Sequence, residues 1–104
     1  MKGDSQEDRQ EMAQRGIRLR LFGLRGARMN KIDEQPFPYT PDLTVSGVWS
    51  ELQRRAEPHS QLARLQRDMV LALKNGEPIH RLAGWDTPLA DGDTLTFMVK
   101  AFGG

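Results

Sequence analysis

Residues 87–104 read TPLADGDTLTFMVKAFGG, and this stretch decides the fold. Asp91-Gly92 is a tight-turn signal, and residues 94–100 after it alternate apolar and polar side chains. That period of two predicts a strand with one buried side. The side chains expected to face the core are Leu95, Phe97 and Val99. Two glycines, Gly103 and Gly104, then close the sequence.

A buried strand is predicted just upstream of this stretch. Residues 69–74 (MVLALK) form a short apolar run that ends at Asn75-Gly76. Asn-Gly suits a type I′ hairpin, because both central residues of that turn need a positive φ. Pro78 places the returning strand at a sheet edge.

The first predicted element is another strand, residues 17–22 (IRLRLF). Its alternation turns Ile17, Leu19 and Leu21 toward the core and leaves Arg18 and Arg20 in water. Three prolines at positions 36, 38 and 41 exclude a central strand in the segment that follows. An edge strand within residues 28–40 stays open.

Between these strands the sequence predicts one main helix. Thr44 is the expected N-cap, and Pro58 ends the helix. The apolar positions follow helical spacing as one stripe, namely Val45, Val48, Trp49, Leu52 and Ala56. Residues 59–67 are expected to add a short second helix with Leu62 and Leu65 facing inward.

The order of elements predicts an α+β domain, with four or five strands and one main helix packed on one face of the sheet. A chain of 104 residues has room for one such domain. We assign residues 1–15 to a frayed or disordered polar tail, 16–100 to the domain, and 101–104 to a flexible tail that carries Gly-Gly.

Composition excludes several classes of protein. Fifteen basic and 14 acidic residues give a formal net charge of +1, so nothing indicates a nucleic-acid binder. The chain has no cysteine, which excludes disulfides, a cysteine nucleophile and thiolate metal sites. Apolar runs are too short for a membrane span, and the first residues lack a secretory signal, so we expect a cytoplasmic protein.

Candidate metal and catalytic residues are better explained by ordinary structural roles. Asp91 and Asp93 flank a turn and lack the further oxygen ligands of a calcium loop. His59 and His80 have no carboxylate or cysteine at ligand spacing, so we expect surface histidines. No serine lies in a nucleophile-elbow motif.

In order along the chain, four pieces resemble the MoaD/ThiS family of sulfur carriers. They are the strand ending Leu21-Phe22, the helix opening Thr44-Val45, the hairpin Leu73-Lys74-Asn75-Gly76-Glu77, and residues 87–95 followed by the closing Gly-Gly. The resemblance covers roughly residues 16–104 and implies a ubiquitin-like β-grasp fold with a mixed four- to five-stranded sheet. Within this family the sequence most resembles the small subunit of molybdopterin synthase.

The resemblance implies a carrier protein rather than an enzyme. An E1-like enzyme would use ATP to adenylate Gly104, and a persulfide sulfur donor would convert it to a thiocarboxylate. Gly103 would give clearance in the partner's channel. The expected acceptor is the molybdopterin synthase large subunit, in molybdenum or tungsten cofactor synthesis. No bound cofactor and a monomeric free carrier are expected.

Other functions stay open at this stage. The alternatives are sulfur transfer for thiamin, cysteine or tRNA thiolation, and conjugation of Gly104 to lysines of target proteins. A third reading is a ubiquitin-like interaction domain that is never activated. For partner docking the candidates are Phe102, Arg18, Arg20 and Trp85. Trp85 either covers the edge of the core or is exposed as an interface anchor.

Overall fold

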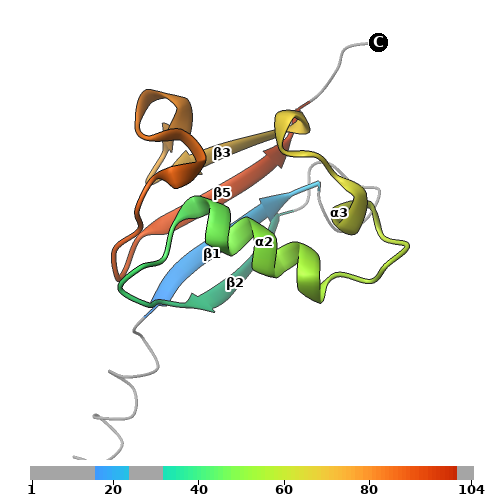
Figure 1. The fold of residues 1–104 in the computed structure, drawn as a ribbon, viewed down its shortest axis with the longest axis horizontal. Helices are drawn as coiled ribbons and strands as arrows, with labels where there is room; N and C mark the ends of the chain where they lie inside the picture. Colours follow the sequence, from blue (N-terminus) through green and yellow to red (C-terminus); the bar gives the residue numbers. More distant parts are fainter. Residues whose placement is uncertain (1–15, 24–31, 101–104) are drawn as a thin grey trace, which may run out of the picture.

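A computed structural model of the chain describes residues 16–23 and 32–100. The tails predicted for residues 1–15 and 101–104 lie outside this range. Five strands form one mixed sheet, and helix α2 lies across one face of it (Figure 1). The strands are β1 (Gly16–Phe22), β2 (Ile32–Pro38), β3 (Val70–Lys74), β4 (Glu77–Pro78) and β5 (Thr94–Val99). The helices are α2 (Val45–Arg55) and α3 (Gln61–Arg64), with 3-10 turns η1 (Arg67–Met69), η2 (Ile79–Arg81) and η3 (Gly84–Asp86).

The predicted architecture is therefore confirmed. The sheet order is β2-β1-β5-β3-β4, so the first and last strands are neighbours at its centre. β1 and β5 run parallel, whereas the other pairs are antiparallel. Parallel neighbours require a long crossover. Here the crossover is the segment between β1 and β5, which includes α2 on one face of the sheet.

Strand β2 shows how a proline-rich segment joins a sheet. It pairs only with β1 and forms one edge, as its prolines require. The N–H of Arg18 donates to the Asp93 carbonyl, across to β5, at 2.8 Å, so its neighbours in β1 turn their backbone groups toward β2. The register then points the backbone nitrogens of Pro36 and Pro38 away from the sheet. Because the two prolines have no N–H group at these outward positions, no hydrogen bond between β1 and β2 is lost. The exposed edge also has fewer donors with which to pair with another strand.

The β3–β4 hairpin also forms as predicted. Asn75 and Gly76 have φ of 51° and 86°, the pair of positive values that a type I′ turn needs. The strand begins at Val70, one residue later than expected, because Met69 belongs to η1. β5 ends at Val99, although the N–H of Lys100 still donates to the Met69 carbonyl at 2.9 Å.

Helix α2 begins where its cap places it. The Oγ1 of Thr44 accepts a hydrogen bond from the N–H of Gly47 at 3.1 Å. Val45, Val48 and Trp49 are fully buried against the sheet. The helix ends at Arg55, with Ala56 half-buried as its C-cap. α3 is shorter than the segment expected, but Leu62 and Leu65 are buried as predicted.

The core fills the space between the sheet and α2. Its centre is an aromatic cluster in which the Trp49 and Phe97 ring centroids lie 5.0 Å apart, edge to face. Leu19, Leu21 and Leu95 are also fully buried.

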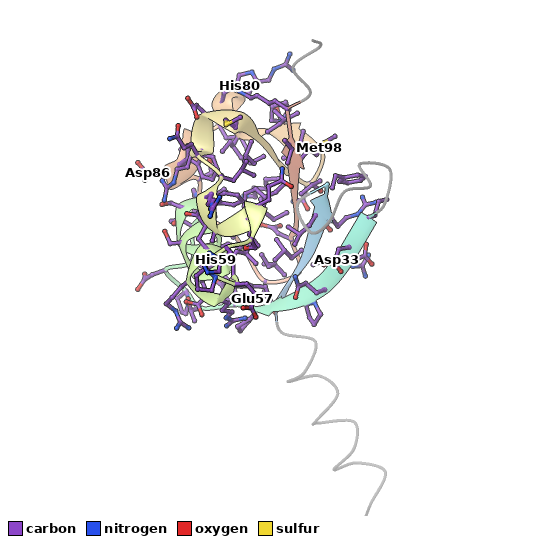
Figure 2. The ribbon with its side chains drawn as sticks, turned by 90° about the vertical axis from the view of Figure 1, so that its right-hand side faces the viewer. Asp33, Glu57, His59, His80, Asp86 and Met98 are labelled. Carbon is purple, nitrogen blue, oxygen red and sulfur yellow. The ribbon has the colours of Figure 1, made fainter. Side chains whose placement is uncertain are left out.

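Figure 2, turned by 90°, shows Met98 on the β5 side of the molecule and Glu57 and His59 beside the helices.

Candidate functional site

The predicted reacting residues lie just past the last described strand. Phe102, Gly103 and Gly104 are outside the described residues. The structure therefore describes the strand from which they extend and not the three residues themselves. Gly104 is four residues beyond Lys100, which limits its reach to about 14 Å from that residue. The candidate site is therefore the end of β5 and the surface around it.

Strand β5 is a rigid base for these residues. β1 pairs with it on one side and β3 on the other, and both Leu95 and Phe97 are 0% exposed. The Lys100–Met69 hydrogen bond extends this anchoring one residue past the strand. The chain beyond Lys100 therefore follows directly from a strand of the hydrophobic core.

Arg18 and Arg20 lie on the face of the sheet that α2 leaves uncovered, as their alternation predicts. Arg18 is exposed. Arg20 is half-buried: its Nε lies 3.3 Å from a Glu34 carboxylate oxygen, and its guanidinium carbon lies 5.6 Å from the Phe22 ring centroid. Arg20 is therefore held in place by neighbours within the sheet, while Arg18 is the more accessible cation.

Trp85 covers the edge of the core and is not exposed as an interface anchor. It is partly buried in η3, and its ring stacks on Phe97 with centroids 6.1 Å apart and an interplanar angle of 13°. The guanidinium carbon of Arg67 lies 5.0 Å from the Trp85 centroid. Trp85 lies on the helix side of the sheet, so it does not share a face with Arg18 and Arg20.

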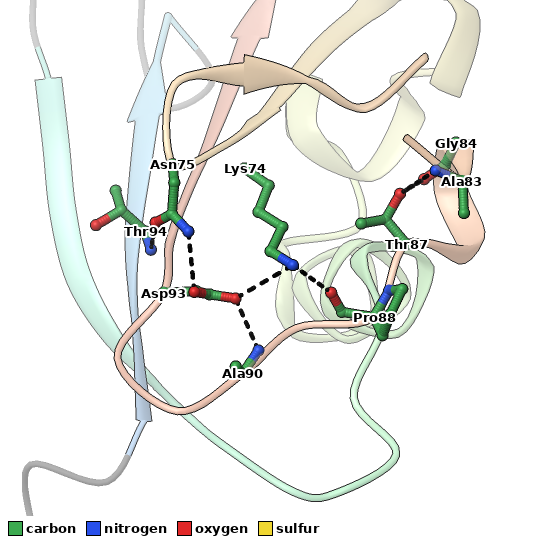
Figure 3. Close-up of polar contacts among 9 residues, drawn as sticks. All are labelled: Lys74, Asn75, Ala83, Gly84, Thr87, Pro88, Ala90, Asp93 and Thr94. Atoms are coloured by element: carbon green, nitrogen blue, oxygen red, sulfur yellow. Dashed lines mark hydrogen bonds and ion pairs between the residues drawn. The ribbon is translucent and has the colours of Figure 1, made fainter. Parts of the chain in front are cut away.

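The side chains of the Asp91-Gly92-Asp93 turn make hydrogen bonds within the fold. Asp91 accepts a hydrogen bond from the N–H of Gly16 at 2.6 Å. Asp93 accepts one from the N–H of Ala90 at 2.7 Å, and the Lys74 ammonium lies 3.7 Å away (Figure 3). Within the described residues, no group of three His, Cys, Asp or Glu side chains is placed to hold a metal ion.

This network also sets the acidity of Asp93. Burial alone raises the pKa of the carboxyl group, but the Ala90 N–H, the Asn75 amide and the Lys74 ammonium outweigh it. The net effect lowers the pKa below the ordinary value of 3.8, so Asp93 is a carboxylate near neutral pH. Lys74, in turn, donates to the Pro88 carbonyl at 3.0 Å.

Sequence reasoning missed an apolar row on the uncovered face. Phe22 pairs with Ile32 on one side and with Met98 on the other, and Met98 pairs with Leu71. We call these four residues the tail-side row, because it crosses the sheet at the end where β5 leads to Lys100. Ile32 is 43% exposed and the other three are half-buried. The signal was present: Phe22 and Met98 are apolar at positions where the alternation predicts a side chain in water.

An open groove lies at the opposite end of β1 and β5. It has a volume of about 740 Å³. Its lining comes from the beginnings of these strands and from β2, including Gly16, Arg18, Pro36, Phe37 and Thr94. Five residue steps along β5 separate Thr94 from Val99, roughly 17 Å. The groove and the candidate site are therefore at different ends of the sheet.

The two histidines that were considered as metal ligands lie in different elements. His59 lies in the loop before α3 and His80 in η2, and both are exposed (Figure 2). No helix in the described part of the chain is long and apolar enough to cross a membrane.

Comparison with known proteins supports the fold. No protein-family model matches the chain, and no curated protein matches it either. Solved structures do match, among them two from Haloferax volcanii. The HVO 2177 protein is 27% identical over 86% of this chain and 87% of its own, with a TM-score of 0.66. SAMP1, a ubiquitin-like small archaeal modifier protein, is 19% identical over 86% of this chain and 99% of its own, with a TM-score of 0.55. The chain therefore has a ubiquitin-like β-grasp fold of the kind found in these two archaeal proteins.

Proposed function

We propose that this chain is a ubiquitin-like carrier or modifier whose Gly104 carboxyl group is activated by an E1-like enzyme. One observation carries the proposal: Gly103-Gly104 follows within five residues of Val99, the end of the central strand of a β-grasp sheet. The similarity to SAMP1 supports it, since that protein is a modifier of this fold. The chain acts as a co-substrate, and the catalytic groups belong to its partner.

The proposed chemistry needs only the terminal carboxylate. One carboxylate oxygen attacks the α-phosphorus of ATP, pyrophosphate leaves, and a mixed anhydride with AMP forms. A sulfur or amine nucleophile then attacks the carbonyl carbon, and AMP leaves. Glycine fits this task because it has no Cβ and allows close backbone approach inside a narrow channel. Gly104 therefore reacts, and Gly103 provides clearance.

The nucleophile separates the two forms of the proposal. Hydrosulfide yields a thiocarboxylate directly; a persulfide yields an acyl disulfide, which a thiol then reduces to the thiocarboxylate. A target lysine yields an isopeptide bond instead. The resemblance to MoaD/ThiS carriers favours sulfur, with molybdopterin synthase as the first acceptor to test. The similarity to SAMP1 supports the modifier form. Both forms share the adenylation step.

Adenylation is tested by exchange of labelled pyrophosphate into ATP, catalysed by the E1-like enzymes of the source organism. The full chain should support exchange with one of them. A variant that lacks Gly104 should support none while keeping the same thermal unfolding, because β5 ends at Val99. Equal exchange with both chains, or none with either, would contradict the proposal.

A further inference from the structure

Asn75-Gly76 has a chemical property that its role as a hairpin turn does not use. Both residues are exposed, and an added Cβ at Gly76 would meet no atom within 4 Å. Asparagine loses its side-chain amide most readily when glycine follows it, because the next backbone nitrogen then approaches the amide carbon without hindrance from a Cβ. The turn is therefore a candidate site of spontaneous covalent modification.

The reaction at such a site needs water and no enzyme. The backbone nitrogen of Gly76 gives up its proton and attacks Cγ of Asn75, and the bond from Cγ to Nδ2 breaks. The leaving nitrogen takes up the proton and departs as ammonia, which leaves a succinimide ring. Water then opens the ring at either carbonyl group and gives aspartate or isoaspartate at this position. A carboxylate thus replaces an amide, and no electrons are gained or lost.

Hydrogen bonds in the folded structure restrain the groups that would react. The N–H of Asn75 donates to the Thr94 carbonyl at 2.7 Å. The Nδ2 of Asn75 donates to Asp93 at 2.9 Å, and its Oδ1 accepts from the N–H of Thr94 at 2.8 Å (Figure 3). Ring closure requires that the Asn75 side chain turns from β5 toward its own backbone. That rotation breaks these bonds, so the reaction waits for the two turns to separate.

The carboxylate that the reaction produces does not fit this network. The Nδ2 of Asn75 is a donor, and its partner Asp93 is already a carboxylate near neutral pH. A carboxylate in place of the amide offers no donor and sets two negative charges against each other. Lys74, whose ammonium lies 3.7 Å from Asp93, already donates to the Pro88 carbonyl. The modification therefore separates the β3–β4 turn from the turn before β5.

We propose that Asn75 is a site of spontaneous deamidation that its bonds to Asp93 and Thr94 restrain in the folded domain, and that the resulting carboxylate breaks the link between the two turns. The modification accumulates while the turns are apart and keeps them apart afterwards. Each modified chain therefore records a period of opening. This inference does not depend on the activation of Gly104.

The rate of the reaction at each asparagine tests the site. Deamidation adds roughly 1 Da, and peptide mapping of the full chain locates it. In urea, Asn75 should react at least about tenfold faster than in the folded protein, because the reaction no longer waits for opening. Asn30, which precedes Lys31, is the internal control, and in urea it should react at least about tenfold more slowly than Asn75. Gly76→Ala should slow the reaction at Asn75 in urea to a similar extent.

A pair of variants tests the hydrogen bonds themselves. Asp93→Ala, kept below its unfolding temperature, should deamidate at Asn75 several times faster than the folded wild type. Leu62→Ala, which removes a buried side chain in α3, is the control for lost stability and should stay close to the wild-type rate. Equal rates in urea and in the folded protein, or in the two folded variants, would overturn the restraint. If Asn30 reacts as fast as Asn75 in urea, the assignment of the site is wrong.

Thermal unfolding tests the consequence. Asn75→Asp should melt several degrees below Asn75→Gly, because both lose the Nδ2 donor and only the first adds a charge. Glycine accepts the positive φ of this position, so Asn75→Gly keeps the turn. Adding Asp93→Asn to Asn75→Asp exchanges the amide and the carboxylate, and this should recover part of the difference. Equal melting of Asn75→Asp and Asn75→Gly, or no recovery in the exchanged pair, would overturn the proposed consequence.

Discussion

The Nδ2 of Asn75 donates a hydrogen bond to Oδ1 of Asp93 at 2.9 Å, which ties the β3–β4 turn to the turn before β5 (Figure 3). The Oδ1 of Asn75 accepts from the N–H of Thr94 at 2.8 Å, so one amide side chain joins the two turns twice. These bonds fix the beginning of β5, the strand whose other end leads to Gly104.

Removing the Asp93 carboxylate should destabilise the fold. Asp93→Ala leaves the Ala90 N–H without its acceptor and releases Asn75 and Lys74. The expected loss is about 1–3 kcal/mol in the free energy of unfolding, measured by urea denaturation. Asp86→Ala, at an exposed position, is the control and should cost less than about 0.5 kcal/mol. Equal losses in the two variants would show that the network contributes nothing.

The same carboxylate predicts a pH dependence. The pKa of Asp93 is lowered in the folded protein, so its contribution is complete above the unfolded value of 3.8. That contribution falls as pH drops through the folded pKa. Glu51 behaves alike, because Arg54 and Arg55 lower its pKa from 4.5 to about 2, but its ion pairs lie at the surface, where salt screens them. Urea denaturation between pH 6 and 2 should show a shallower decline for Asp93→Asn than for the wild type. Parallel curves would refute the assignment to Asp93.

Local signals predicted most of this fold. Alternation gave the inward residues of β1 and β5, Thr44 marked the start of α2, and Asn75-Gly76 marked the hairpin, because each depends on chain-local geometry. The path of β2 stayed open for a physical reason. Whether Pro36 and Pro38 fit a strand depends on which side of it has a neighbour, and only the assembled sheet decides that.

The residues of the candidate site also differ in whether local sequence signals predict them. Gly103-Gly104 stays a prediction, and the outward position of Arg18 could be predicted from the sequence. The tail-side row could not, because Ile32 and Leu71 reach it through strand register between segments far apart in the chain. Sequence alone also left Trp85 undecided, since its contact with Phe97 depends on where η3 packs.

Two glycines should respond in opposite directions to alanine. At Gly16 an added Cβ would lie 2.6 Å from the Phe37 carbonyl oxygen, so backbone must move, and we expect a loss of about 1–3 kcal/mol. At Gly47, in the first turn of α2, the nearest atom would be the Thr44 hydroxyl at 3.6 Å, an ordinary contact. Gly47→Ala should stabilise by about 0.5–1 kcal/mol through a stiffer unfolded chain. Thermal and urea unfolding measure both, and a stabilising Gly16→Ala would contradict the packing of β1 on β2.

Phe102 should matter to binding and not to folding. It is three residues beyond Val99, and a large apolar side chain there is costly to leave in water. We expect it to fill a pocket of the activating enzyme and set the register of Gly-Gly. Phe102→Ala should raise the KM for exchange severalfold with unfolding unchanged, and Phe102→Leu should restore part of the loss. Unchanged kinetics in Phe102→Ala would rule this role out.

The central claim is that Gly104 is activated, and the intact mass of the chain tests it most directly. The full chain is incubated with the organism's E1-like enzymes, ATP and sulfide, and the modified residue is located by fragmentation. The account predicts a gain of roughly 16 Da at Gly104, as sulfur replaces one carboxyl oxygen, or an isopeptide bond from Gly104 to a lysine in cell extract. A chain whose mass is unchanged with every such enzyme, and that forms no lysine adduct, would contradict it.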